Sequence, residues 1–256
     1  MRKKYIKALI AAILTGGCIC AGSFCIYKAF QEEQPYIEAK ESYEELRREV
    51  TVNGQTEENT EKPDILMERE IDFDVLKDKN EDIIAWLYIP GTPVDYPVCR
   101  GKDSEFYLHH NAEKEKNILG SLFVPPENNP DLNDTHIIIY GHNMKQGQMF
   151  GELSNYEDED FFKENPYVYL YTPQQNRTYL VYSVYRCEPE SLTFTAGFLP
   201  GTKEYMEWQS YSIGNQIYVT GAEGLVNSNS RILTLATCAD GNRKQRLVVN
   251  CVEAEN

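Results

Sequence analysis

Short apolar stretches separated by turn residues fill most of this chain, from residue 85 to residue 252, and they constrain its fold more than any other feature. The stretches are rich in β-branched and aromatic residues and end at Pro, Gly or Asn, which is typical of strands. About nine strands are expected, at residues 86–89, 94–98, 120–124, 135–140, 167–171, 179–185, 216–219, 231–237 and 246–252. Helical patterns interrupt them at residues 149–162 and 202–211. The sequence therefore predicts a mostly antiparallel β-barrel with helical insertions.

The N-terminal residues have a different composition. Four basic residues in the tail at 1–7 precede an uncharged stretch, which as a helix would be about 30 Å long and could cross the apolar core of a bilayer. We expect residues 8–28 to be an uncleaved transmembrane anchor, because the apolar run continues past the small residues at 21–23 where a signal peptide would be cut. A cleaved signal and a lipoprotein site at Cys18 are the alternatives. The basic flank predicts a cytoplasmic N-terminus and an extracellular remainder.

Residues 29–63 are expected to be an extracellular stalk and linker, because they are polar and dense in charged side chains. The globular domain is expected at residues 64–256, and the apolar residues at 71–84 fit one or two short amphipathic helices that separate near Asn80. After residue 28 the chain carries 20 Lys and Arg against 40 Asp and Glu. This acidic surface excludes nucleic acid as a partner and is best explained by solubility.

Four of the seven cysteines lie outside the expected anchor, at positions 99, 187, 238 and 251. None of their spacings fits a metal site, so neither a metal nor another cofactor is expected. A disulfide between Cys99 and Cys187 remains open. A domain of this size can bury a sufficient core without disulfides, so a free thiol outside the cell would have another reason to exist, such as catalysis.

A thiol, an imidazole and a guanidinium stand at the ends of three predicted strands. Cys238 ends one strand beside a polar turn, and Arg246 begins the next strand. His142 follows an earlier strand and comes directly after Gly141, which permits close backbone approach. A thiolate can attack a carbonyl, an imidazole can move protons, and a guanidinium can hold the resulting oxyanion. Together these residues predict acyl transfer at one rim of the sheet.

Each of these residues also has a plainer interpretation. Cys238 would be a buried core residue, and Arg246 would form a surface ion pair, with Arg243 and Lys244 as rivals for the catalytic role. Asp240 either orients a catalytic neighbour or caps the turn. Among the other histidines, His136 lies inside an apolar strand and is expected to be structural, while those at 109 and 110 could serve fold, solubility or substrate.

These residues make the chain similar to the sortases, the membrane-anchored cysteine transpeptidases of Gram-positive bacteria. The segment Thr234 to Cys238, followed by Arg246 at the start of the next strand, matches the family pattern T-L-x-T-C and arginine. The resemblance is to class B in particular and is carried by residues 86–92, 95–98, 107–110, 139–144, 147 and 149–150. It implies an eight-stranded sortase-type β-barrel with N-terminal helices and a helical insertion before the strand of the nucleophile, and it covers residues 65–252.

The resemblance also implies a two-step reaction. Cys238 would cleave the Thr-Gly or Thr-Asn bond of a C-terminal sorting signal on a secreted protein, and the thioacyl enzyme would then transfer the acyl group to an amine of peptidoglycan. His142 would move the protons, Arg246 would hold the substrate and its oxyanion, and Asp240 would assist. Substrate contacts are expected at Tyr140, Ala236, Thr237 and Asn111. Ala236 departs from the hydroxyl residue that is common there in class B.

Three alternatives remain open at this point. A class B pilin polymerase would use the lysine of a pilin as acceptor, and a hydrolytic cell-wall cysteine peptidase would deliver the acyl group to water. A non-catalytic binding domain tethered to the membrane would bury Cys238 in its core. Assays with different amine acceptors would distinguish the enzymes from one another. The reactivity of the Cys238 thiol toward an alkylating reagent would distinguish them from a binding domain.

Overall fold

The computed structural model describes residues 2–52, 69–144, 147–239 and 242–254, and of residues 2–21, 238, 239, 242 and 243 it describes the backbone alone. The chain divides into two compact units, residues 1–42 and 43–256. Helix α1 (Arg2–Val50) begins in the first unit and ends in the second. Among the residues whose side chains are described, no helix carries an apolar stretch long enough to span a membrane. Most of the expected anchor at residues 8–28 falls outside that part of the chain.

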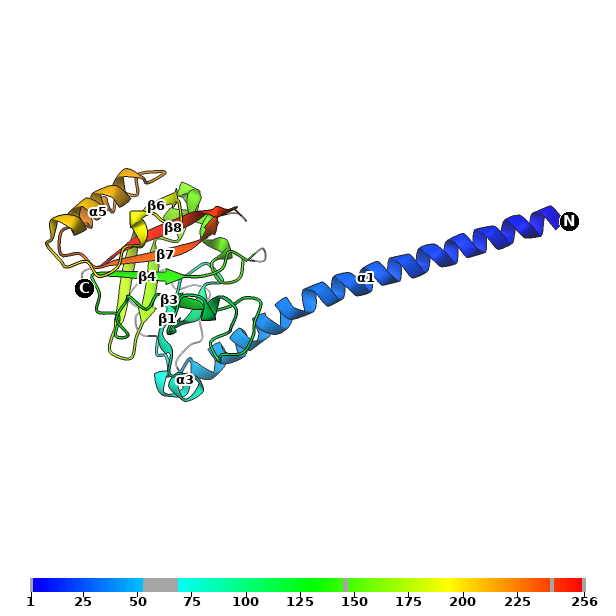
Figure 1. The fold of residues 1–256 in the computed structure, drawn as a ribbon, viewed down its shortest axis with the longest axis horizontal. Coiled ribbons are helices and arrows are strands. Elements are labelled where there is room, and N and C mark those ends of the chain that lie inside the picture. Colours follow the sequence, from blue (N-terminus) through cyan, green and yellow to red (C-terminus); the bar gives the residue numbers. More distant parts are fainter. Residues whose placement is uncertain (1, 53–68, 145–146, 240–241, 255–256) are drawn as a thin grey trace. The chain divides into compact units, whose positions relative to one another are not determined.

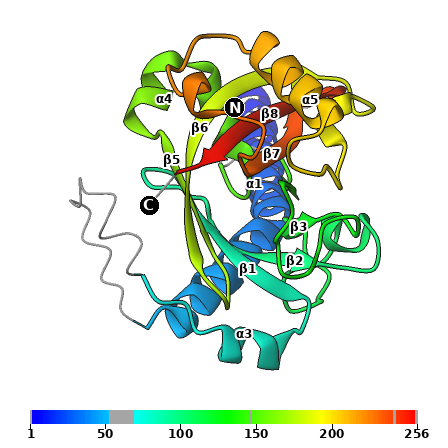
Figure 2. The same ribbon diagram turned by 90° about the vertical axis from the view of Figure 1, so that its left-hand side faces the viewer.

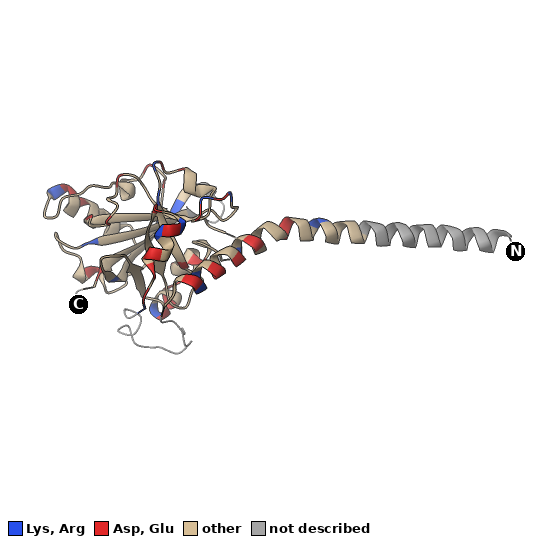
Figure 3. Cartoon of the chain, turned by 90° about the horizontal axis from the view of Figure 1, so that it is seen from below, with Lys and Arg blue, Asp and Glu red and all other residues tan. Residues whose placement is uncertain are grey.

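The described residues of the first unit form one helix, and acidic residues outnumber basic ones among its described side chains. Figure 3 shows Asp and Glu positions recurring along the coloured part of α1. Pro35 lies inside the helix, and Lys28 forms an i,i+4 ion pair of 4.0 Å with Glu32 on the exposed surface. Residues 31–38 of α1 are exposed or half-buried, so this part of the helix is solvated.

The second unit is built on a closed β-barrel (Figures 1 and 2). In the described part of the chain eight strands form it, in the spatial order β1-β2-β3-β4-β7-β8-β6-β5. This confirms the predicted eight-stranded barrel. The strands are β1 (Ile83–Tyr88), β2 (Asp95–Arg100), β3 (Leu122–Val124), β4 (His136–Tyr140), β5 (Tyr167–Tyr171), β6 (Asn176–Cys187), β7 (Ile232–Ala239) and β8 (Asn242–Glu253).

Most neighbouring strands of the barrel are antiparallel, but two pairs are parallel. β2 pairs with β3, and β4 pairs with β7, in parallel registers. Between β4 and β7 the chain forms β5, β6 and the helix α5 (Lys203–Gly214), so the parallel neighbours are joined by a long crossover connection. Parallel pairing places the C-terminal ends of β4 and β7 at the same end of the barrel.

Short helices cover the outside of the barrel. They are α3 (Phe73–Lys79), α4 (Glu159–Glu164) and the 3-10 helices η1 (Phe106–Leu108), η2 (Gly151–Glu157), η3 (Leu192–Phe194) and η4 (Glu223–Leu225). The expected helix before the nucleophile strand is α5, whose Ser212 hydroxyl lies 2.8 Å from the Tyr182 hydroxyl of β6. Figure 2 shows α5 beside the β6–β8 side of the barrel.

Two local predictions were wrong. Residues 216–219 form no strand, because they follow directly on the C-cap of α5 and Ile217 donates a single backbone hydrogen bond, to Val184, in place of a ladder. Ile83 and Ile84 do not belong to a second amphipathic helix. They begin β1, where Ile83 pairs with Cys99, and both side chains are buried in the barrel.

The second unit begins at Tyr43, earlier than the expected domain boundary at residue 64. The last turns of α1 bury Tyr43, Leu46 and Val50, and the Tyr43 hydroxyl donates to the Gly120 carbonyl at 2.6 Å. Nearby, the Arg47 Nε atom lies 3.0 Å from the Asp95 carboxylate. These residues fasten the end of α1 to the barrel.

Asp95 is the centre of a buried ionic cluster. Its carboxylate accepts two hydrogen bonds from the Arg69 guanidinium, at 2.8 and 3.2 Å, and one from the Trp86 indole at 2.6 Å. The Arg69 guanidinium also lies over the ring of Tyr88, 5.1 Å from its centroid. The charge of this arginine is therefore satisfied inside the barrel unit.

The disulfide between Cys99 and Cys187 does not form. Both cysteines are buried free thiols, as is Cys251. Burial raises the pKa of all three thiols above its usual value. These thiols therefore stay protonated at neutral pH and are poorly suited to attack a carbonyl.

Candidate active site

The backbone of β4, β7 and β8 brings three of the predicted site residues together. In the parallel β4–β7 pair, Tyr140 lies beside Ala236, so His142 and Cys238 each come two residues later on neighbouring segments. The antiparallel β7–β8 pair sets Cys238 directly opposite Arg246. The chain therefore gathers residues 142, 238 and 246 at one rim of the barrel, although they are far apart in the sequence.

Part of the predicted site lies outside the described residues. The structure describes only the backbone of Cys238 and Arg243, and Asp240 lies outside the described residues entirely. Lys244, the other rival of Arg246, is exposed. Arg246 is half-buried, and its Nη1 atom donates to the Gln245 carbonyl at 3.2 Å.

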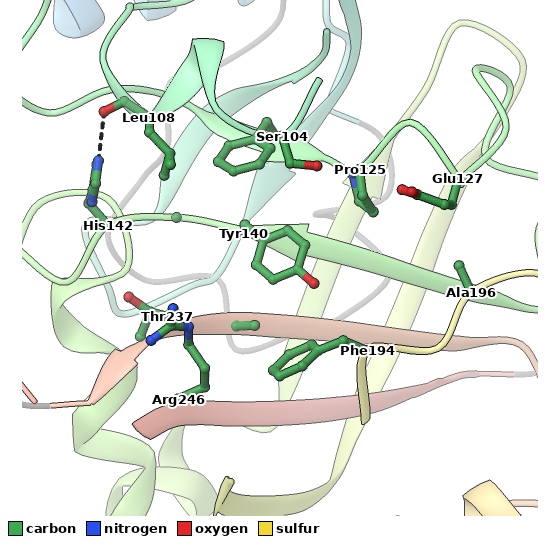
Figure 4. A pocket seen from close by; sticks show the side chains of 13 residues that line it. Ser104, Leu108, Pro125, Glu127, Tyr140, His142, Phe194, Ala196, Thr237 and Arg246 are labelled. Atoms are coloured by element: carbon green, nitrogen blue, oxygen red, sulfur yellow. Dashed lines mark hydrogen bonds between the residues drawn. The ribbon is translucent and has the colours of Figure 1, made fainter. Parts of the chain in front are cut away.

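A cavity of about 570 Å³ opens at this rim (Figure 4). His142, Arg246 and three of the four predicted substrate contacts line it, namely Tyr140, Ala236 and Thr237. Its other lining residues are Ser104, Leu108, Phe123, Pro125, Glu127, Gly141, Phe194 and Ala196. The mixture of aromatic walls with a few polar groups is typical of a ligand site.

The ring of His142 is held by a backbone carbonyl. Its Nε2 atom donates to the Leu108 carbonyl oxygen at 2.7 Å, as Figure 4 shows. A carbonyl oxygen only accepts hydrogen bonds, so Nε2 carries a hydrogen in this arrangement and the neutral ring keeps its acceptor at Nδ1. Nδ1 is therefore the nitrogen that can take up or release a proton.

Gly141 is required immediately before His142. A Cβ atom at this position would lie 2.5 Å from a Leu122 methyl carbon and 2.7 Å from the Phe150 ring. Gly141 also donates its backbone N–H to the Ala236 carbonyl at 3.2 Å, which extends the β4–β7 pairing by one residue. Close packing on one side and this hydrogen bond on the other fix the backbone that carries His142.

Tyr140 forms an aromatic wall between the two ends of the cavity. Its ring centroid lies 5.6 Å from that of Phe123 and 5.8 Å from that of Phe194. Burial raises the pKa of Tyr140 to about 12; the Glu127 charge adds to this shift and the Arg246 charge opposes it. The phenol is therefore neutral at physiological pH and can donate or accept a hydrogen bond.

Thr237 lines the cavity next to Ala236. Its Oγ1 atom is buried and has no hydrogen-bond partner among the described residues. Ala236 beside it is fully buried and presents only a methyl group. Position 236, where class B often has a hydroxyl residue, therefore adds no polar group to the cavity wall.

Asn111 is not among the described residues that line the cavity. Its side-chain oxygen accepts hydrogen bonds from the backbone N–H groups of Glu113 and Glu115, at 3.0 and 2.9 Å, and the residue is buried. In this structure Asn111 organises the loop that follows η1. The structure thus brings Tyr140, Ala236 and Thr237 together and separates Asn111 from them.

His136 has the structural position expected for it. It is fully buried, its Nδ1 atom donates to the Thr195 carbonyl at 2.7 Å, and its Nε2 atom lies 2.7 Å from the Thr234 hydroxyl. Burial lowers its pKa to about 4. The ring of His110 stacks on Phe106 at 3.9 Å, and His109 is exposed.

Sequence reasoning missed two contributors to the site, the carbonyl of Leu108 and the carboxylate of Glu127. A backbone carbonyl has no residue type that could have revealed it. Glu127 follows the two prolines at 125 and 126, a pattern that marks a turn and carries no chemical signal of its own.

Comparison with known proteins gives a consistent result. The sortase domain family matches residues 87–254. Sortase B of Listeria monocytogenes is 34% identical over 163 residues, which are 64% of this chain and 65% of that protein. The crystal structure of Clostridium perfringens sortase B is similar with a TM-score of 0.67 at 36% identity, covering 72% of this chain and all of that one. Sortase B of Bacillus anthracis, solved in complex with AAEK1, gives 0.73 at 27% identity, covering 87% and 99%.

Proposed function

Because this chain belongs to the sortase B family of cysteine transpeptidases, we propose that it cleaves the sorting signal of exported proteins and transfers the acyl group to an amine of peptidoglycan. The observation that carries the proposal is the register of β4, β7 and β8, which sets Cys238 opposite Arg246 and beside the segment of His142. The cavity at this rim supports it, because it offers space for a peptide next to these residues.

The first half-reaction forms a thioester. The Cys238 thiolate attacks the carbonyl carbon of the scissile bond, and the Arg246 guanidinium stabilises the negative charge that develops on the carbonyl oxygen. When the tetrahedral intermediate collapses, the C–N bond breaks and protonated His142 donates a proton to the leaving amine. The Leu108 carbonyl orients the ring for this transfer through its hydrogen bond with Nε2.

The second half-reaction reverses these roles. The acceptor amine attacks the thioester, neutral His142 removes a proton from the attacking nitrogen, and the Cys238 thiolate leaves as the new amide bond forms. Asp240, two residues after the nucleophile, is proposed to assist. The neutral phenol of Tyr140 and the buried hydroxyl of Thr237 are proposed to contact the bound peptide.

We further propose that residues 8–28 anchor the protein in the cell membrane, with residues 1–7 in the cytoplasm and residues 29–63 as an extracellular stalk. This proposal rests on the basic flank and the uncharged stretch of the sequence. It would place the catalytic barrel on the outer face of the membrane, where exported proteins and peptidoglycan precursors meet.

The test uses the full-length chain in detergent micelles with a panel of sorting-signal peptides. With a peptidoglycan-stem amine present, we expect ligated product in preference to hydrolysis, and Cys238→Ala should abolish both cleavage and ligation while folding normally. Ligation to a pilin lysine but not to the stem amine would indicate a pilin polymerase, and hydrolysis that the amine does not divert would indicate a peptidase. Wild-type turnover by Cys238→Ala would contradict the mechanism.

A further inference from the structure

One charged residue that lines the cavity has no role in the proposed reaction. Glu127, in the loop between β3 and β4, is the single acidic residue among the described residues that line it. Figure 4 shows Glu127 and Ala196 at one end of the cavity and His142 at the other, with the Glu127 carboxylate directed back toward Pro125. The cavity therefore has a negative charge at the end opposite the catalytic imidazole.

The backbone on both sides of Glu127 is fixed by hydrogen bonds. The Arg100 guanidinium of β2 donates to the Pro126 carbonyl at 2.7 Å and to the Asn128 carbonyl at 2.8 Å. The fully buried Asn128 side chain donates to the His136 carbonyl at 2.8 Å and accepts the Ile138 backbone N–H at 3.0 Å. Glu127 is thus an exposed residue between two anchored neighbours, which fix the backbone from which its carboxylate extends.

The Glu127 carboxylate has no ion pair or hydrogen bond with another described residue. Its charge nevertheless reaches the cavity, since Glu127 and Arg246 act in opposite directions on the phenol of Tyr140. Apolar and aromatic walls from Phe123, Pro125 and Phe194 lie along the same cavity. Such walls can pack the aliphatic part of a long basic side chain whose charged end reaches a carboxylate.

We propose that Glu127 selects a cationic side chain, a lysine or an arginine, in the acyl-donor peptide. This inference rests on the proposed function and specifies the substrate that the same site prefers. The acceptor amine must reach the thioester carbon at the Cys238 rim, near His142, whereas Glu127 lies at the opposite end of the cavity (Figure 4). That separation favours the donor peptide over the acceptor as the source of the cation.

The test measures kcat/KM for full-length protein on fluorogenic sorting peptides in which a lysine is moved through the positions before the scissile threonine. At each position the lysine is compared with norleucine, which keeps the alkyl chain without the charge, and with glutamate. We expect the protein to prefer lysine at one position by about fivefold, as for a partly exposed ion pair, and to lose the preference in high salt. Glu127→Gln should remove the preference, and Glu127→Lys should transfer it to the glutamate peptide.

The matched control is Glu105→Gln, which removes an exposed carboxylate outside the cavity lining and should leave the preference unchanged. A lysine preference that survives in Glu127→Gln would overturn the proposal. The proposal would also be overturned if the Glu127 variants changed only how the rate depends on acceptor amine concentration. In that case the cation that Glu127 binds would belong to the acceptor. If the wild-type protein cleaves none of the peptides, the proposed function itself fails, whatever the Glu127 variants do.

Discussion

Strand β4 has one histidine at its start and another just past its end, and the two histidines are held in different ways. His136, at the start of β4, is fully buried, and both ring nitrogens have partners, the Thr195 carbonyl and the Thr234 hydroxyl. His142, just past the end of β4, is half-buried, and in the described part of the chain only Nε2 has a hydrogen-bond partner. A histidine with both nitrogens bonded in a dry core stabilises the fold, whereas one with a nitrogen left at a cavity can exchange protons.

The two arginines Arg69 and Arg246 show the same difference. Arg69 is buried, and its guanidinium binds the Asp95 carboxylate through two nitrogens. Arg246 is half-buried at the wall of a cavity that also holds His142. The burial and location of a charged residue, rather than its type, therefore separate the part of the barrel that provides stability from the rim that we propose to be catalytic.

The largest effect expected from this comparison is on His142. We expect His142→Ala to lower kcat/KM for peptide cleavage by about 10²–10⁴-fold, because the variant has no group to protonate the leaving amine. Thermal unfolding should change little, since the half-buried ring makes one described hydrogen bond. Near wild-type turnover would remove His142 from the mechanism and with it the functional distinction between the two histidines.

A slightly smaller loss is expected for Arg246. Replacing it by alanine should lower kcat by about 10²–10³-fold, the usual effect of removing an oxyanion donor. Arg246→Lys should restore only part of the rate, because an ammonium lacks the planar pair of donors of a guanidinium. Arg243→Ala is the control, and steady-state kinetics should show a mild effect. A severe loss in Arg243→Ala with normal turnover in Arg246→Ala would exchange the two assignments.

The stability of the protein should fall in mild acid because of His136. Its pKa is about 4 in the folded state, against 6.5 for a histidine that is open to solvent. Between these values the unfolded chain binds a proton that the folded chain does not, so stability is complete above pH 6.5 and falls as the pH drops toward 4. The loss should approach about 3 kcal/mol, from the difference in pKa.

Urea unfolding of the wild-type protein and of His136→Gln at several pH values measures this effect. At neutral pH the variant should be the less stable protein, because it loses hydrogen bonds in the core. The difference between the two proteins should shrink as the pH falls through the window, since only the wild-type chain carries the His136 penalty. A difference that stays constant from pH 7 to pH 4 would show that His136 does not titrate as its burial requires.

Much of the barrel could be predicted from the sequence, because strand periodicity and turn residues are local signals. The failures occurred where tertiary contacts decide the structure. Tyr43, Leu46 and Val50 are buried on the barrel, although they stand in a charged stretch that resembles a stalk. The residues near 217 follow the C-cap of α5 and make a single described backbone hydrogen bond to β6, from Ile217 to Val184, so they form no strand ladder.

The rim of the site was predictable because Cys238, His142 and Arg246 stand at strand ends, where side chains can meet. The elements that orient them carry no such signal. The Leu108 carbonyl that holds His142 comes from the end of a 3-10 helix, and the position of Glu127 depends on a guanidinium that reaches across from β2. These contacts follow from the closure of the barrel and could not be read from the spacing of residues.

The smallest effects are expected for substitutions of two threonines in β7. Thr234 lies in the buried part of the strand, and Thr237 lies near the end that borders the cavity. The Thr234 hydroxyl lies 2.7 Å from both His136 Nε2 and Asn250 Oδ1, so Thr234→Val should cost about 1–3 kcal/mol of stability by leaving buried groups without partners. Thr237 has a buried hydroxyl with no partner among the described residues, so Thr237→Val should leave the unfolding temperature unchanged and instead raise KM for the peptide. Kinetics and calorimetry on both variants measure the contrast. If Thr237→Val lowered stability and left KM unchanged, its hydroxyl would belong to the core rather than to the substrate.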